Sequence, residues 1–409
     1  MKRFASLILA FILLCGCMAI PAGAKHAANR DCLKFKQDGT FKIIQVSDLQ
    51  EGFLCSPITQ DFLYDLAKKE RPDLFVLTGD NIAGGLTNLG FRLGSNIAVK
   101  VSIDAFMRVF DRIYCDFGIP VTMVYGNHDN EDHWFSRAEQ FKLYTKHKSF
   151  IGWADSGADK GTKDNLGEHY GTHNLLIKDS AGKGPIFNLW LFDSGSNDER
   201  GGYSCVQKPQ IDWFKATNEA VGKLPSIAFQ HIMVPEVYDY LTPANPGDEN
   251  SFSREFIDAG DNVTKKYVSW ELPAGVPGVM REPPGPGKYN EGQYAALTGA
   301  GNVLALFVGH DHVNTYEITV QGGLDLVCSP GTGYGPYGDG DLRGVRVITL
   351  NESSLTAYET STLHYISYYG DSPLRRARAE MAQEMNSWAA LLDVFSFKPL
   401  FWLIGLFTK

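Results

Sequence analysis

Residues 303–312 read VLALFVGHDH, six apolar residues followed by a glycine and a block of histidine and aspartate. The same arrangement, an apolar run that ends in polar residues, occurs four times earlier in the chain. These segments are residues 41–50 (FKIIQVSDLQ), 73–81 (DLFVLTGDN), 120–129 (PVTMVYGNHD) and 226–231 (SIAFQH). Short apolar runs of this kind predict buried strands. The polar residues therefore fall at the carboxyl ends of five predicted strands.

Segments with helical periodicity lie between the first three predicted strands, which indicates an α/β fold. Residues 59–69 and residues 99–116 both carry apolar side chains on one helical face. Alternating strands and helices are typical of sheets with parallel strands. The carboxyl ends of such strands gather at one edge of the sheet. We therefore expect the five polar blocks to converge.

The second half of the chain is richer in strands joined by short turns. Residues 170–177 and 186–192 predict a β-hairpin, and residues 209–221 predict a helix. Residues 241–290 are rich in Pro, Gly, Asn and Asp, which favours a long loop insertion over a separate domain. Further strands are predicted at residues 315–320, 324–328, 344–350 and 354–359. We expect one domain over residues 38–362.

The composition of the 409-residue chain is that of a globular protein. Hydrophobic residues make up 44% and charged residues 21%, which excludes a disordered, collagen-like or coiled-coil chain. A mean hydropathy of −0.17 excludes a polytopic membrane protein. The net charge of −9 lacks the basic excess of a general nucleic-acid binder.

Residues 1–24 have the pattern of a secretory signal peptide, with a buried N-terminal helix as the alternative. A basic start, an apolar run and a small-residue cleavage site (AGA at residues 22–24) follow one another. Residues 14–17 (LCGC) also resemble a bacterial lipoprotein box, in which Cys17 would carry a lipid. We expect an exported protein that is periplasmic, secreted or membrane-anchored.

Residues 370–409 are predicted to form a helical, apolar C-terminal tail. Within it, residues 391–407 (LLDVFSFKPLFWLIGLF) are interrupted by charges and a proline, so the apolar part is too short to span a bilayer. Trp402 and the flanking Lys398 favour an anchor at a membrane interface over a helix docked on the domain.

Five cysteines follow the signal peptide, and no two of them form a CxxC pair. This excludes a zinc-finger or thioredoxin-like motif. The odd number leaves at least one thiol free, and the sequence does not define any pairing. The cysteines are Cys32, Cys55, Cys115, Cys205 and Cys328.

The polar blocks supply carboxylate oxygens and imidazole nitrogens, a ligand set that suits Mn, Zn or Fe. A lone aspartate after a strand is more often a turn former, and a lone histidine is more often structural. Five such blocks in succession favour a metal site. His310 and His312 are two residues apart, so in extended backbone their side chains point to the same side.

The blocks, taken in order, resemble the motifs of the calcineurin-like metallophosphoesterase superfamily. They are residues 47–50 (SDLQ), 79–81 (GDN), 126–129 (GNHD), the lone His231 and residues 309–312 (GHDH). The resemblance spans residues 48–312 and implies a four-layer α/β/β/α sandwich within the α/β class.

Within that superfamily, residues 41–50 and 309–317 resemble the branch related to purple acid phosphatases. True purple acid phosphatases have a tyrosine three residues after the Gly-Asp aspartate. Ala83 occupies this position here. The chain is therefore similar to the branch that lacks the tyrosinate ligand, which argues against Fe(III)–tyrosinate chemistry.

The resemblance implies two divalent metal ions as cofactors. The first would be held by Asp48, Gln50, Asp80 and His312, and the second by Asp80, Asn127, His231 and His310. Asp80 would bridge the two ions. Gln50 stands where the family usually has histidine. Its neutral amide is a weaker ligand, which leaves the identity of the first metal open.

The chemistry that the resemblance implies is phosphoester hydrolysis by a hydroxide that bridges the two metals. His128 would offset charge on the phosphoryl oxygens and protonate the leaving group. Asp129 would orient the His128 imidazole.

Other polar residues are weaker candidates. Asp193, His133 and Tyr203 are candidates to line the cleft, although Asp193 suits a turn equally well. Residues 331–341 (GTGYGPYGDGD) lack the lysine of a P-loop and predict a loop near the metals. Arg343 is predicted to contact a phosphate or to form a surface salt bridge.

The favoured function is hydrolysis of a phosphomonoester outside the cytoplasm. A phosphodiesterase or nucleotidase is the alternative among enzymes. A non-catalytic surface binding protein on a degenerate scaffold is the alternative of another class, and Gln50 is its only support. The expected partner is a small-molecule or macromolecular phosphoester, without specific nucleic-acid binding. Membrane association through Cys17 or the C-terminal tail stays open.

Overall fold

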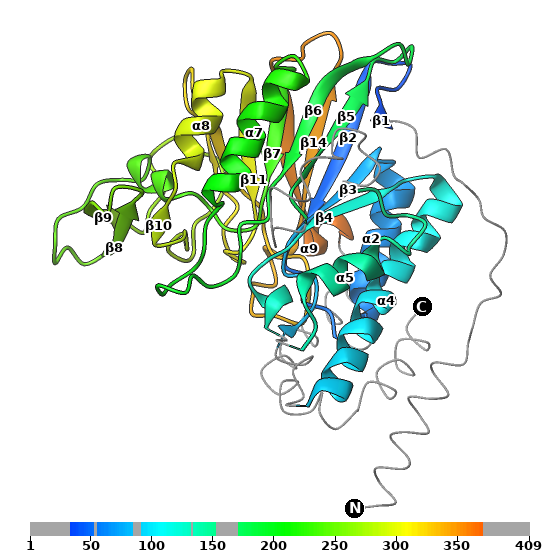
Figure 1. The fold of residues 1–409 in the computed structure, drawn as a ribbon, viewed down its shortest axis with the longest axis horizontal. Helices are drawn as coiled ribbons and strands as arrows, with labels where there is room; N and C mark the ends of the chain where they lie inside the picture. The colour runs from blue at the N-terminus through cyan, green and yellow to red at the C-terminus, as the bar shows by residue number, and fades with distance from the viewer. Residues whose placement is uncertain (1–32, 53–54, 85–90, 132–133, 153–170, 371–409) are drawn as a thin grey trace, which may run out of the picture. The chain divides into compact units, whose positions relative to one another are not determined.

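The computed structural model describes residues 33–52, 55–84, 91–131, 134–152 and 171–370 (Figure 1). The predictions for the signal peptide, the lipoprotein box, Cys32, His133 and the C-terminal tail lie outside these residues. Within them, none of the helices has the length and apolarity needed to cross a membrane. Cys115, Cys205 and Cys328 are free thiols.

Two β-sheets form the centre of the domain. The seven-stranded sheet has the order β1-β5-β6-β7-β11-β13-β12 and the five-stranded sheet the order β15-β14-β2-β3-β4. Strands β6, β7, β11 and β13 run parallel to one another in the first sheet, as do β2, β3 and β4 in the second. Antiparallel pairs lie toward the edges.

The strands of the larger sheet are β1 (Leu33–Lys34), β5 (His173–Lys178), β6 (Pro185–Leu191), β7 (Ser226–Phe229), β11 (Val303–Val308), β12 (Glu317–Ile318) and β13 (Asp325–Cys328). Those of the smaller sheet are β2 (Thr40–Val46), β3 (Leu74–Thr78), β4 (Val121–Val124), β14 (Gly344–Asn351) and β15 (Tyr358–His364). All five polar blocks follow strands of the parallel regions, as predicted from the sequence.

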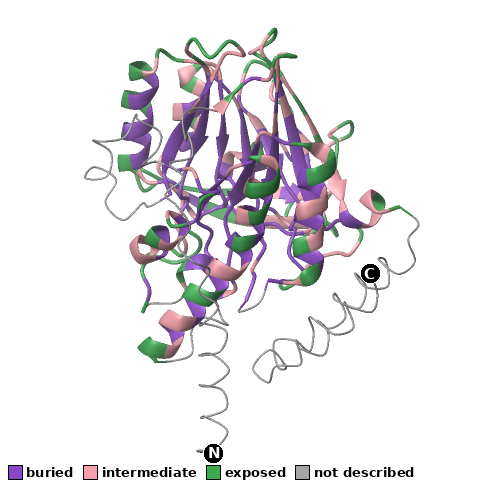
Figure 2. Cartoon of the chain, turned by 90° about the vertical axis from the view of Figure 1, so that its right-hand side faces the viewer, coloured by how far each residue is buried: buried purple, intermediate pink, exposed green. Residues whose placement is uncertain are grey.

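Helices cover the outer face of each sheet (Figure 1). The smaller sheet is covered by α2 (Pro57–Glu70), α4 (Arg92–Phe117) and α5 (Arg137–Tyr144), and the larger sheet by α7 (Lys208–Ala220) and α8 (Gln293–Ala300). Short helical turns are η1 (His128–Asn130), η3 (Pro235–Asp239) and α9 (Tyr365–Tyr368). Exposed residues lie on the outward faces of the helices and in the loops (Figure 2).

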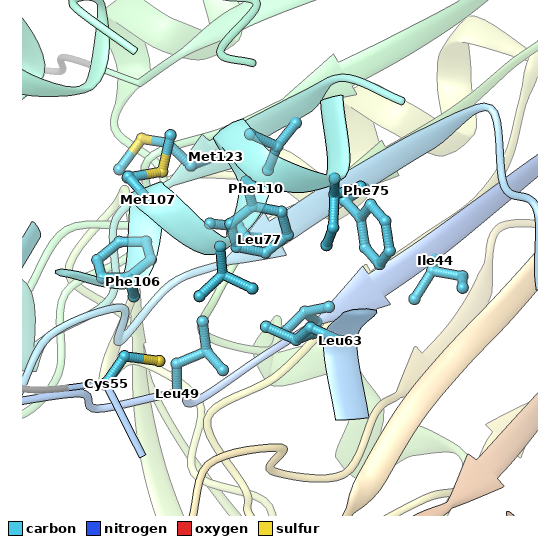
Figure 3. Close-up of a cluster of buried hydrophobic side chains, with 14 of the residues drawn as sticks. Ile44, Leu49, Cys55, Leu63, Phe75, Leu77, Phe106, Met107, Phe110 and Met123 are labelled. Carbon is cyan, nitrogen blue, oxygen red and sulfur yellow. The ribbon is translucent and has the colours of Figure 1, made fainter. Parts of the chain in front are cut away.

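The alternation of side chains along each strand explains the four layers. In β2, Phe41 and Ile43 belong to the core between the two sheets, whereas Ile44 and Val46 belong to the core under α2 and α4. Figure 3 shows this second core, where Ile44 and Phe75 lie near side chains of the two helices. A third core lies between the larger sheet and α7. The predicted α/β/β/α sandwich agrees with this layering.

The structure differs from the sequence prediction in two strand regions. Residues 241–290, expected to be loop, contain β8 (Ser251–Asp258), β9 (Val263–Ser269) and β10 (Tyr289–Asn290), which form a separate three-stranded sheet. Most side chains of the β8–β9 hairpin are partly or fully exposed, so its sequence lacks the apolar run that predicts a buried strand. β15 begins at Tyr358 because turns at Ser354 and Ala357 occupy the predicted start.

Replacing Phe75 tests the core under α4. Its ring lies 5.4 Å from that of Phe110 and is fully buried. We expect Phe75→Ala to lower the free energy of unfolding by about 3–5 kcal/mol, because the truncation leaves a cavity. Chemical denaturation measures this loss. The matched control is Phe91→Ala, since Phe91 is 58% exposed, and its effect should stay within about 1 kcal/mol. Equal losses in the two variants would contradict this account of the core.

Candidate metal centre

The carboxyl ends of strands from both sheets bring the predicted ligands together. Asp48 follows β2, Asp80 follows β3 and His231 follows β7. One ligand atom of each lies within 4.8 Å of the others, and all three residues are buried. The sequence separation of these residues shows that the site is a product of the tertiary fold.

Distances between side-chain atoms link both predicted metal positions. His231 Nε2 lies 3.4 Å from Asp80 Oδ2 and 3.0 Å from Asn127 Oδ1. His312 Nε2 lies 3.2 Å from Asp48 Oδ1. The His310 ring is 5.0 Å from the His231 ring, centroid to centroid. The predicted ligands of the two ions thus form one cluster.

Backbone carbonyls fix the orientation of two imidazoles. His231 Nδ1 is 2.8 Å from the carbonyl oxygen of Thr78, and His312 Nδ1 is 2.8 Å from that of Tyr337. A carbonyl can only accept, so each Nδ1 carries the proton. Each Nε2 faces the carboxylates, and in the neutral ring it carries the lone pair that a metal ion needs. Metal-binding histidines are commonly held in this way.

Charge and burial perturb the pKa values in the cluster. Burial opposes the charged imidazole of His231, but Asp80 and Asp48 outweigh it and raise the pKa of His231 to about 10. Burial likewise opposes ionisation of Asp80, yet His231 and His128 hold the pKa of that carboxyl well below its usual range. Burial lowers the pKa of His310 to about 3, with His231 adding to the effect. Asp80 is therefore an ionised, acceptor-only group at neutral pH.

The backbone is strained at the same residues. Asp48, Gln50, Asp80 and His310 have φ angles of 55°, 42°, 51° and 71°. Non-glycine residues rarely adopt this left-handed region, and such residues concentrate at functional sites. Of seven such residues in the described part of the chain, four are predicted metal ligands.

Two glycines let the strands approach each other beside the ligands. A Cβ atom on Gly309 would collide with the Ser47 hydroxyl, and one on Gly126 would collide with the Asp80 carboxylate. The glycines in GHDH and GNHD are therefore needed for close packing.

The donor set fits divalent metal ions. When His231 and His312 are neutral and protonated at Nδ1, as metal ligands must be, Asp48 Oδ1 is buried without a hydrogen-bond donor among the described residues. A buried carboxylate oxygen without a donor is costly unless a cation completes its environment. Gln50 Nε2 lies 3.2 Å from Asp80 Oδ2 and 3.5 Å from His312 Nε2. Rotation of this amide would direct its oxygen to the same place.

Asp129 does not orient His128, contrary to the sequence prediction. Its carboxylate accepts hydrogen bonds from the backbone N–H groups of Gly126, Asn81 and Ile82. Burial and the Asp80 carboxylate raise the pKa of Asp129 to about 7. Asp129 thus ties the β3 and β4 loops together.

Glu131 takes the role that was predicted for Asp129. Glu131 Oε1 lies 2.6 Å from His128 Nδ1. This hydrogen bond, together with the charge of Asp80, outweighs burial and raises the pKa of His128 to about 9. The signal was present in the sequence, because Glu131 is three residues after His128 and side chains at that spacing meet on a helical turn.

The weaker candidates divide into structural residues and neighbours of the site. Asp193 is buried and forms an ion pair with Arg137 at 2.5 Å, so it does not line the cleft. Arg343 is buried as well, and its guanidinium donates to the carbonyls of Gly333 and Pro336. It contacts backbone of the Gly-rich loop, so the prediction of a surface salt bridge was wrong.

The Gly-rich loop and Tyr203 do lie beside the cluster. The Tyr337 ring stacks on His312 at 4.1 Å with an interplanar angle of 9°. The Tyr203 ring meets His310 edge-on at 4.4 Å and is 38% exposed. Sequence reasoning missed Tyr337, and it missed Ser47, whose hydroxyl donates to Asp48 Oδ2 at 2.6 Å. Neither residue type carries a pattern that marks it as a neighbour of a ligand.

Comparison with known proteins agrees with the geometry. Residues 41–314 match the family model of the calcineurin-like phosphoesterases. The "Probable inactive purple acid phosphatase 28" of Arabidopsis thaliana is 27% identical over 348 residues, covering 75% of this chain and 74% of that protein. The "Probable inactive purple acid phosphatase 14" of the same plant is 26% identical over 386 residues, covering 85% and 84%. A crystal structure of a dimetal phosphatase from Danio rerio superposes with a TM-score of 0.44 at 15% identity, covering 80% of this chain and 99% of that one.

The assignment of Glu131 as the partner of His128 can be tested by titration. In the metal-free protein, Glu131→Gln should lower the pKa of His128 from about 9, because the hydrogen bond to a carboxylate stabilises the charged imidazole. Histidine signals in NMR spectra recorded across pH measure this shift. Asp129→Asn serves as the comparison, and it should lower protein stability while the pKa of His128 stays high. A larger pKa shift in Asp129→Asn than in Glu131→Gln would restore the original prediction.

Proposed function

Since the chain belongs to the calcineurin-like phosphoesterase family, we propose that it is an exported, metal-dependent hydrolase of phosphomonoesters. The observation that carries this proposal is the buried convergence of Asp48, Asp80 and His231 from different strands. Asn127, His310 and His312 adjoin them. Export rests on the signal-peptide pattern of residues 1–24.

The residues would hold two divalent ions in the arrangement that the sequence predicts. One ion would be held by Asp48, Gln50 and His312. The other ion would be held by Asn127, His231 and His310. Asp80 would bind both ions. When bound, such ions supply Lewis acidity and lower the pKa of water. The protein itself supplies buried carboxylate oxygens and imidazole Nε2 atoms in fixed orientations.

His128 is placed to act on substrate rather than to bind metal. Its Nδ1 is engaged by Glu131, its Nε2 lies 3.9 Å from Asp80 Oδ2, and its side chain is 39% exposed. A raised pKa keeps the imidazole protonated at neutral pH. It can therefore offset phosphoryl charge and give a proton to the leaving oxygen. Glu131 acts through His128 as a positioning residue.

A non-catalytic binding protein is the second candidate. Gln50 at a ligand position favours it, as do the two plant relatives whose names include "inactive". The intact Asp80, His128 and His310 favour catalysis. Turnover of nitrophenyl phosphate by metal-loaded protein decides between the two. Comparison with bis-nitrophenyl phosphate separates a monoesterase from a phosphodiesterase or nucleotidase.

Two substitutions rank the metal ligands. Asp80→Asn removes the charge that both ions would share, whereas Gln50→Ala removes one neutral ligand. We expect Asp80→Asn to lower turnover at least about 100-fold more than Gln50→Ala does. Asp80→Asn should also lose more metal. Elemental analysis and kinetics on the same preparations measure both quantities. Near-native turnover and full metal occupancy in Asp80→Asn would overturn the site.

A second pair of substitutions separates catalysis from metal binding. His128→Ala should retain both metals but lose turnover by roughly 10²–10³-fold. The loss should be larger for alkyl phosphates than for nitrophenyl phosphate, whose leaving oxygen needs little protonation. His310→Ala should lose metal and activity together. If His128→Ala loses metal as His310→Ala does, His128 is a ligand. If His128→Ala slows hydrolysis of both substrates equally, His128 stabilises charge but does not protonate the leaving group.

A further inference from the structure

A cavity of about 450 Å³ opens beside the metal cluster. The β8–β9 hairpin forms one wall, and Tyr203 with the segment that precedes β10 forms the other. Its lining residues include Tyr203, Arg254, Glu255, Lys265, Gly285 and Lys288. Three cationic side chains and one carboxylate line it, so the cavity carries an excess of positive charge.

The cavity wall is continuous with the predicted metal ligands. Tyr203 packs its ring edge-on against His310. On the other side, a Cβ atom on Gly285 would lie 3.1 Å from His310 Nε2, and Gly285 donates its N–H to Asp311. A molecule whose phosphoryl group reached the metals would therefore extend past His310 into this cavity.

Arg254 is exposed on one face of the hairpin. Phe252 and Phe256 share its face of β8, and their rings lie 5.6 Å and 5.1 Å from that of Tyr238. Burial raises the pKa of Tyr238, and the nearby Arg254 guanidinium opposes that rise. The Tyr238 hydroxyl donates to the carbonyl of Pro284, next to Gly285. These contacts connect Arg254 with the segment that reaches His310.

Two of the three cations are not paired with a carboxylate. Lys265 pairs with Glu255 at 3.7 Å. Among the described residues, neither Arg254 nor Lys288 forms an ion pair. Lys288 lies against Gly202, where an added Cβ would sit 3.3 Å from the Lys288 Cβ. Unpaired Arg and Lys in a concave site suit a phosphate, which accepts several charge-assisted hydrogen bonds.

We propose that this cavity binds a second phosphate on the leaving group, so that the substrates are small molecules with two phosphates. The proposal rests on the proposed phosphoesterase activity and names its substrate class. One phosphate would reach the metal cluster, and the other would bind Arg254 and Lys288.

The test compares alkanediol bisphosphates of increasing chain length with alkyl monophosphates of the same length. We expect metal-loaded wild-type protein to favour the bisphosphate at one or more lengths by about 10-fold in kcat/KM. Arg254→Gln and Lys288→Met should remove this preference and leave the alkyl monophosphates unaffected. The control is Lys183→Ala, which removes one positive charge at the exposed turn between β5 and β6. It should retain the preference.

The outcomes separate this subsite from the proposed activity. Turnover without a preference at any chain length, or a preference that persists in both variants, overturns the subsite alone. If no phosphoester is hydrolysed, the proposed function fails, and calorimetric binding to the metal-loaded protein decides the subsite. Tighter binding of a bisphosphate than of its monophosphate, lost in Arg254→Gln, supports the subsite. Equal affinity for the two overturns it.

Discussion

Two ionised carboxylates held side by side in the protein interior are the constraint on which the site depends. Asp48 and Asp80 are fully buried, and their charges repel each other. Hydrogen bonds offset part of the cost. The Ser47 hydroxyl and the His310 N–H donate to Asp48, and the His128 N–H donates to Asp80. The remaining cost favours a cation between them. This requirement explains why histidines from both sheets surround the pair.

The approach of the two sheets makes this arrangement possible. Asp48 and Asp80 belong to the five-stranded sheet, whereas His231 and His310 follow strands of the seven-stranded sheet. The apolar core between the sheets fixes their separation. The Gly-rich loop adds a further support, because buried Arg343 binds its carbonyls and the loop in turn presents the Tyr337 carbonyl to His312. A buried guanidinium thus helps to orient an imidazole.

The sequence predicted the strands and the polar blocks well because both are local signals. A short apolar run that ends in a turn, such as residues 303–308, is typical of a buried strand. The partner of His128 was not predictable in the same way. Asp129 and Glu131 are both close to it in sequence, and only the helical turn at residues 128–130 directs Glu131 toward the ring. The β8–β9 hairpin was missed because its exposed strands lack an apolar run.

The left-handed backbone of the predicted ligand residues lowers the stability of the protein, while their side chains serve the proposed function. A non-glycine residue in this conformation costs about 1–2 kcal/mol, and glycine would relieve that cost at Asp48, Gln50, Asp80 or His310. The same exchange would delete a predicted metal ligand. Selection for heat resistance alone would therefore favour glycine at these positions and remove the predicted metal site. If related proteins keep all four side chains despite this cost in stability, selection acts on the function of the site.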